Sequence, residues 1–250
     1  MVELFRSSSL LTIMLTMVNT SVVLRAILIV SVFLTLSSQY FEVSAQERRA
    51  QIREDVRIIE TYPFSDPNPV PILPSDARLY PYHRFEGYAH HSEPADWKVV
   101  HLENEWIELW VLPEVGGKVW GARVKETGHE FIYRNEVMKF RNIALRGPWT
   151  SGGIEFNFGV IGHTPSTATP VDYLTREHSD GSVSVVVGAM DLPSRTHWRV
   201  EVRLPANSAY FETNVLWWNP TTLEQPYYNW MTAAAFAQDD LVMSIPGNAY

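Results

Sequence analysis

The chain has 250 residues, 46% of them hydrophobic and 19% charged, which suffices for one sizeable core and excludes a wholly disordered protein. Lys and Arg number 20 against 28 Asp and Glu, so the net charge is −8, and without a dense basic cluster we expect no nucleic-acid partner. The chain has no cysteine, which excludes disulfides, thiolate zinc sites and a cysteine nucleophile.

Residues 1–45 differ in composition from everything that follows. Arg25 precedes an apolar run over 26–36, and the small-residue pattern Val43-Ser44-Ala45 ends just before Gln46. This order is typical of a signal peptide, so we expect cleavage near Gln46 and a secreted or periplasmic protein. The alternative is an uncleaved membrane anchor over 10–36, which Asn19 and Arg25 interrupt. Contact with a membrane is expected only in that case.

Residues 46–96 are expected to form an extended, proline-rich arm. Hydrophobic residues among the charges of 46–60 permit either a short helix or the start of a strand. Six prolines between Pro63 and Pro81 then exclude a regular helix or a central strand. We expect this stretch to be a linker or to lie against the domain.

From residue 97 to 250 the sequence predicts an all-β domain. Short runs of β-branched and aromatic residues alternate with turn formers such as Gly116-Gly117 and Asp180-Gly181. Two packed antiparallel sheets, a β-sandwich, are therefore expected. The predicted strands are 98–102, 106–112, 118–124, 130–133, 182–190, 197–204, 210–217 and 225–237.

One loop-and-strand segment gathers unusual chemistry. Residues 146–159 read RGPWTSGGIEFNFG, with an arginine, a Gly-Gly pair, a carboxylate, an amide and aromatic rings together. Further motifs lie at 112–120 (LPEVGGKVW), 133–135 (YRN), 162–165 (GHTP) and 229–235 (NWMTAAA). On these motifs the chain resembles a bacterial domain-of-unknown-function family, numbered 5107, over about 97–250.

The resemblance implies a galactose-mutarotase-like β-supersandwich, often fused to tetratricopeptide repeats, that holds sugars on a concave sheet face. It also implies that the domain is incomplete at residue 250. Sugar epimerases of the broader superfamily use a histidine acid and a glutamate base. This sequence has Asn229-Trp230 where those enzymes place a histidine, so simple aldose mutarotation is not expected.

Glu155 and His163 are the candidate catalytic residues. Glu155 stands between aromatic residues beyond Gly152-Gly153, where partial burial would raise a carboxyl pKa and suit it to acid–base work. A salt-bridged strand residue would give the same pattern. His163 follows in a polar loop, where an imidazole can exchange a proton with a sugar oxygen, although a surface loop histidine looks no different.

Five further residues are candidates for binding a substrate. Trp149, Tyr228 and Trp230 offer rings for stacking, while Arg146 and Asn157 can orient a ligand. Trp106, Trp110 and Trp120 have core-like neighbours. We expect no cofactor and no metal: His90 and His91 point apart on an extended chain and lack a third ligand with suitable spacing.

Three functions stay open at this level. An enzyme acting at a glycosidic or hemiacetal carbon, hydrolase or epimerase-like, would use the Glu155–His163 pair. A non-catalytic carbohydrate-binding module needs only aromatic rings and amides. A structural or accessory domain of a longer tetratricopeptide-repeat protein needs neither. A carbohydrate ligand is the expected partner of the first two, and neither the sugar nor an oligomeric state is specified.

Overall fold

The computed structural model describes residues 28, 49–64, 87, 89–142, 148–160, 162–245 and 247. All of the expected signal segment except Leu28, most of the proline-rich stretch and Arg146 therefore lie outside the described residues. Among the residues that are described, no helix has the length and apolar character needed to cross a membrane.

The described part of the chain is built almost entirely of strands, which confirms the predicted all-β class. In chain order they are β1 (Gln51–Tyr62), β2 (Glu93–Glu103), β3 (Ile107–Leu112), β4 (Lys118–Val124), β5 (Met138–Asn142), β6 (Pro148–Thr150), β7 (Ile154–Phe158), β8 (Asp172–Glu177), β9 (Val183–Met190), β10 (His197–Leu204), β11 (Glu212–Trp218) and β12 (Asn229–Ala233). A short 3-10 helix, η1 (Pro165–Thr167), follows β7.

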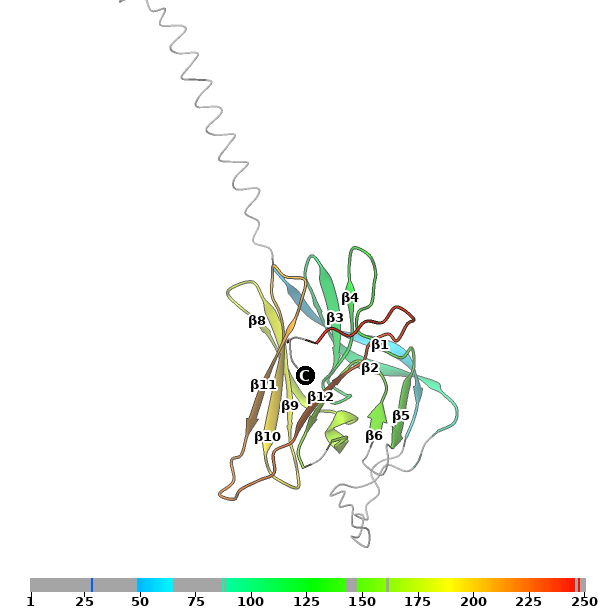
Figure 1. Cartoon of the computed structure of the whole chain (residues 1–250), viewed down its shortest axis with the longest axis vertical. Coiled ribbons are helices and arrows are strands. Elements are labelled where there is room, and N and C mark those ends of the chain that lie inside the picture. Colours follow the sequence, from blue (N-terminus) through cyan, green and yellow to red (C-terminus); the bar gives the residue numbers. More distant parts are fainter. Residues whose placement is uncertain are drawn as a thin grey trace, which may run out of the picture. The chain divides into compact units, whose positions relative to one another are not determined.

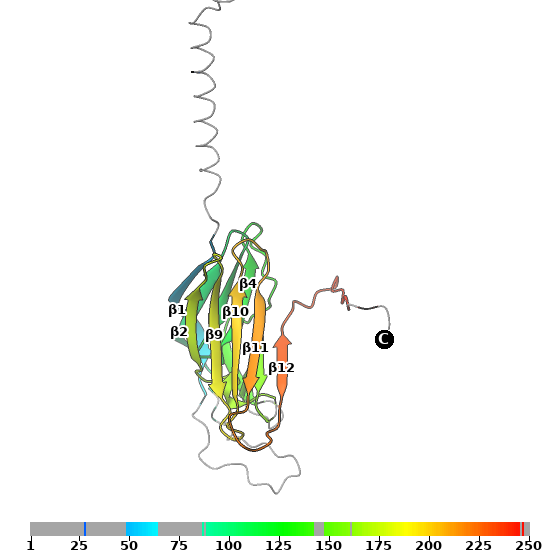
Figure 2. The ribbon, with the colours of Figure 1, turned by 90° about the vertical axis from the view of Figure 1, so that its left-hand side faces the viewer.

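These strands form two sheets that pack face to face. The large sheet has the order β12-β7-β4-β3-β2-β1-β5-β6 and the small sheet the order β11-β10-β9-β8. All neighbours run antiparallel except β1 and β5, which meet in a short parallel pairing. Figure 1 shows the small sheet on one side of the large one, and in Figure 2 the small sheet faces the viewer. The fold is a β-sandwich.

The main core lies between the two sheets, and strand alternation explains why. In β10, Trp198, Val200, Val202 and Leu204 are buried while the residues between them face outward. They pack against alternate apolar residues of β2, β3, β4, β7 and β9. This burial of alternate side chains determines which face of the small sheet packs against the large one.

A second apolar cluster covers the opposite face of the large sheet. It joins Val99, Trp110 and Trp120 of the central strands to Met138 and Phe140 of β5. Because β5 stands near one end of the strand order, it can share a cluster with β4 only if the sheet curls. The curled face is therefore partly filled with side chains, and we call it the inner face of the large sheet.

The structure extends and corrects the predicted elements. The alternative left open for residues 46–60 is decided in favour of a strand: β1 pairs with β2 from Gln51 to Thr61. The sandwich thus begins well before residue 97, and β1 is part of the sheet. Residues 130–133 form only an isolated bridge, whereas β5, β6 and β8 were not predicted. Short strands with mixed polarity carry a weak periodic signal, so pairing partners decide them.

Candidate functional site

A pocket of about 330 Å³ opens at the inner face of the large sheet. Its walls come from β4, from β6 and the turn that follows it, from β7, from the loop after β7 and from β12. The lining residues are Lys118, Trp149, Ser151, Gly152, Gly153, Glu155, His163, Trp230, Thr232, Ala233 and Ala234. Strands β6 and β12 stand at opposite ends of the sheet order, so curling of the sheet brings both to one pocket.

A glycine turn between β6 and β7 shapes one wall. Gly152 and Gly153 have φ of 90° and 75°, values that favour glycine. A Cβ on Gly153 would also stand 2.4 Å from the carbonyl oxygen of Val119. The Gly-Gly pair therefore lets the chain reverse tightly against β4 before Glu155.

Glu155 lies at the base of the pocket because of its register on β7. Its neighbours Ile154 and Phe156 face the main core, so Glu155 and Asn157 face the inner side. Asn157 donates a hydrogen bond from Nδ2 to Glu155 Oε1 at 2.8 Å. The other oxygen, Oε2, is buried and accepts no hydrogen bond from any described group. Such a buried acceptor calls for an explanation, because most are satisfied.

His163 is held over Glu155 by a strained backbone. Its φ of 55° lies in the left-handed region, which costs free energy for a residue with a Cβ. Its backbone N–H donates to Asn157 Oδ1 at 2.6 Å, and its Nδ1 lies 3.3 Å from Glu155 Oε1. Asn157 thus positions both members of the carboxylate–imidazole pair.

Lys118 is a site residue that had no predicted role. Its side chain is 1% exposed, and Nζ donates to the carbonyl oxygen of Thr150 at 2.6 Å. Nζ also lies 3.8 Å from Glu155 Oε2. Burial lowers the pKa of Lys118 to about 8, against the opposing attraction of Glu155. The sequence feature that could have indicated this role is a lysine next to the apolar residues Val119 and Trp120 in a predicted strand.

Aromatic rings flank this polar base. Trp230 is 39% exposed and meets the His163 ring edge-on, with centroids 5.2 Å apart. Trp149 is half-buried on the β6 side. Tyr228 does not line the pocket, but its hydroxyl and the Trp230 ring would both stand 2.9 Å from a Cβ on Gly162. Gly162 therefore allows these rings to approach the loop that carries His163.

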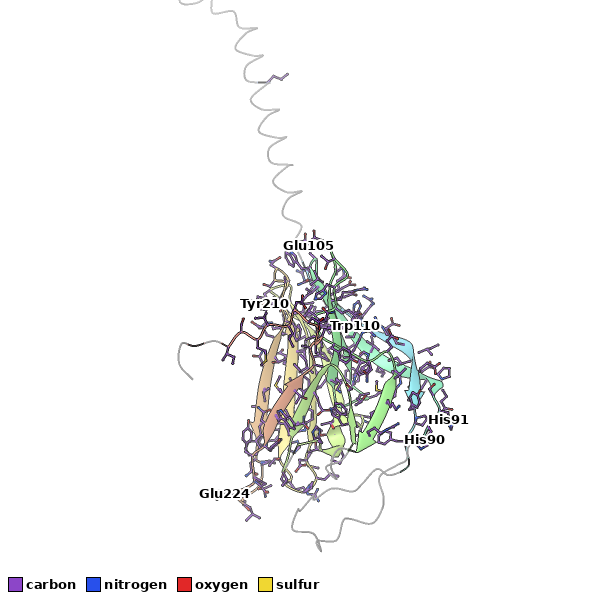
Figure 3. All side chains as sticks on the ribbon, turned by 45° about the vertical axis from the view of Figure 1, so that its right-hand side comes forward. His90, His91, Glu105, Trp110, Tyr210 and Glu224 are labelled. Atoms are coloured by element: carbon purple, nitrogen blue, oxygen red, sulfur yellow. The ribbon has the colours of Figure 1, made fainter. Side chains whose placement is uncertain are left out.

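Most of the predicted site residues come together. Glu155, His163, Trp149 and Trp230 line one pocket, Asn157 supports it, and Tyr228 lies beside it. Arg146 lies outside the described residues. His90 and His91 are exposed at the bend before β2, at the edge of the domain in the view of Figure 3.

One group of side chains elsewhere has metal-ligand chemistry. Ligand atoms of His101, Glu103 and Glu108 lie within 4.8 Å of one another. However, Glu103 is paired with Arg53 and Lys125, and Glu108 with Arg123. Cationic side chains already take both carboxylates, so the group is better described as an ion-pair network than as a metal site.

Comparison with known proteins places these features in a family context. A family model described as Domain of unknown function (DUF5107) matches residues 74–250. The crystal structure of a TPR-domain containing protein from Parabacteroides distasonis is similar, with a TM-score of 0.68 and 28% sequence identity. The match covers 76% of this chain and 33% of that protein, so this chain corresponds to about a third of its length.

Proposed function

The chain belongs to the family of the Domain of unknown function (DUF5107), and we propose that it is a sugar-binding β-sandwich domain of a larger tetratricopeptide-repeat protein. The resemblance to one third of a TPR-domain containing protein supports the accessory-domain part of the proposal. The sugar-binding part stands on the pocket.

The observation that carries the sugar-binding proposal is a pocket with aromatic sides and a buried polar base. A pyranose has an apolar face that packs on rings and a rim of hydroxyls that needs hydrogen bonds. Trp149 and Trp230 supply rings at the pocket wall. A volume of about 330 Å³ lies at the small end of the range for ligand pockets, which suits one sugar residue.

The base of the pocket offers both donors and an acceptor. Glu155 Oε2 has acceptor capacity that no described group uses, and Lys118 has ammonium hydrogens beyond the one given to Thr150. A sugar hydroxyl can donate to the first and accept from the second. Hydrogen bonds to charged groups in a buried site favour binding by about 1.5 to 3 kcal/mol each.

A second candidate is proton transfer at a hemiacetal carbon. The 3.3 Å separation of Glu155 and His163 favours it, because the two groups can share one proton. The usual glycosidase mechanism needs two carboxylates, and Glu155 is the one that lines the pocket among the described residues. Binding is therefore better supported than hydrolysis.

Two tryptophan variants test the proposal. Trp230→Ala removes a pocket ring, and Trp218→Ala is a matched control, because Trp218 is 41% exposed but lies on β11 of the small sheet. Glycan-array screening identifies a ligand, and calorimetry measures its affinity. We expect Trp230→Ala to weaken binding about tenfold or more. Trp218→Ala should leave the affinity unchanged.

Glu155→Gln then separates binding from chemistry. It keeps the shape of the side chain and removes its charge. A binding module loses affinity only, whereas an enzyme loses turnover by roughly a hundredfold or more, measured as a change of anomer ratio or release of reducing sugar. If no glycan binds the wild-type chain, the sugar-binding proposal is wrong and the accessory-domain part stands alone.

A further inference from the structure

Three arginines surround one tryptophan on the inner face of the large sheet. The guanidinium carbons of Arg57, Arg134 and Arg123 lie 4.5, 5.4 and 5.7 Å from the centroid of the Trp110 ring. The arginines come from β1, from the segment after β4 and from β4 itself. Trp110 is 2% exposed, and Figure 3 shows it inside the outline of the domain.

Arg57 is the cation of this cluster that has no carboxylate partner. Arg123 is hydrogen-bonded to Glu108, and Arg134 is paired with Glu130 through Nε and Nη2. Arg57 makes no salt bridge to any described residue. In the ion pairs of this cluster three guanidinium groups meet two carboxylates, and Asp55 attracts Arg57 without forming a salt bridge to it.

Nearby carboxylates offset the charge of Arg57 only in part. Burial, and next the charge of Arg134, lower the pKa of Arg57, while the carboxylates of Glu108 and Asp55 act in the opposite direction. Burial, and next the charge of Arg53, lower the pKa of His101, whose ring stacks on Trp110. The chain as a whole carries −8, and within it three arginines gather around one tryptophan ring.

The cluster adjoins the pocket through Arg134. The backbone of Arg134 is bridged to Gly152, which lines the pocket. Its side chain crosses β4 at Gly121, where an added Cβ would stand 2.8 Å from Arg134 Cδ. Lys118, at the pocket base, precedes Gly121 on the same strand by three residues, or about 10 Å.

From this placement we infer that the cluster of Arg57, Arg123 and Arg134 is a subsite for an anionic group carried by the same ligand that enters the pocket. The ligand is then an acidic saccharide, with one sugar residue between the tryptophans and a carboxylate or sulfate about 10 Å away along β4. This inference rests on the proposed sugar binding.

The chemistry of arginine favours such a ligand. A guanidinium presents a planar fork of N–H donors that matches a carboxylate or sulfate with two parallel hydrogen bonds. Arg57 lies against the Trp110 ring and has no described carboxylate on that fork. An anion placed there would pair with Arg57 while leaving the two existing ion pairs intact.

Calorimetry with matched oligosaccharides tests the inference. The probes are a uronate-containing oligosaccharide, the same oligosaccharide with its carboxyl groups reduced to alcohols, and a sulfated neutral oligosaccharide. The variants are Arg57→Gln, Arg57→Lys and the control Arg176→Gln, which removes one exposed positive charge from β8. Thermal melting establishes that each variant is folded.

We expect wild type to bind at least one acidic probe about 10- to 100-fold more tightly than the reduced probe. Arg57→Gln should abolish that preference, Arg57→Lys should keep part of it, and Arg176→Gln should keep all of it. The stronger of the two acidic probes identifies the anion as carboxylate or sulfate.

Equal affinity of wild type for the acidic and reduced probes would overturn the anionic subsite. So would an Arg57→Gln variant that still prefers the acidic probe as strongly as wild type does. In either case the sugar pocket survives if Trp230→Ala still weakens binding of the reduced probe. Absence of binding by every probe would instead remove the pocket proposal on which the subsite rests.

Discussion

Lys118→Met should change how the stability of the domain depends on pH. In the folded chain burial lowers the pKa of Lys118 to about 8 from the ordinary 10.5. Between these two values the unfolded chain binds more protons at this lysine than the folded chain does. Stability contributed by Lys118 therefore rises as the pH increases from about 8 to 10.5.

The size of the effect follows from the shift. Because the pKa falls from 10.5 to about 8, and a tenfold change in proton affinity corresponds to about 1.4 kcal/mol, the free energy of unfolding rises by roughly 3 to 4 kcal/mol over that interval. Stability rises because a desolvation cost is removed. Below pH 8 the buried Lys118 ammonium keeps its proton and the folded chain bears the cost of burying that charge, with Glu155 Oε2 at 3.8 Å as its counter-charge.

Urea unfolding followed by tryptophan fluorescence at several pH values from 7 to 10.5 measures this dependence. Because other groups also titrate in this range, the quantity to compare is wild type minus variant. Lys118→Met should lack the rise, whereas Lys139→Met, which removes a half-buried lysine from β5, should retain it. Parallel curves for wild type and Lys118→Met would show that the buried ammonium does not carry the assigned cost.

Three other experiments test the site and the expected signal segment. Asn157→Ala removes the hydrogen bonds to the Glu155 carboxylate and to the His163 backbone N–H, so the free energy of unfolding, measured by urea titration, should fall by about 2 to 3 kcal/mol. The control Asn214→Ala, at an exposed position, should lower it by less than about 1 kcal/mol. Gly153→Ala combines a φ of 75° with a 2.4 Å clash and should lower stability by more than about 2 kcal/mol, whereas Gly128→Ala meets nothing within 4 Å and should cost clearly less. Expression with an export system should yield a chain that begins near Gln46 by intact-mass spectrometry, and a secreted chain that retains residues 26–36 would contradict cleavage.

The local sequence carried much of the fold and part of the site. Short runs of β-branched and aromatic residues and the glycine turns between them predicted an antiparallel sandwich, since strand propensity and a requirement for positive φ are both readable from adjacent residues. Glu155 and His163 stand eight positions apart in one segment, and Asn157 between them joins both. Their proximity was therefore foreseeable from the chain alone.

Other features depend on segments far apart in the sequence. β1 carries many charged residues, and it forms a strand because it pairs with β2, some 40 residues later in the chain. Lys118 became part of the site because β4 lies beside β7, and Trp230 because β12 pairs with β7 on its other side. Pairing partners and sheet curvature are set by the summed burial of both faces, a property of the assembled sheets that no local pattern contains.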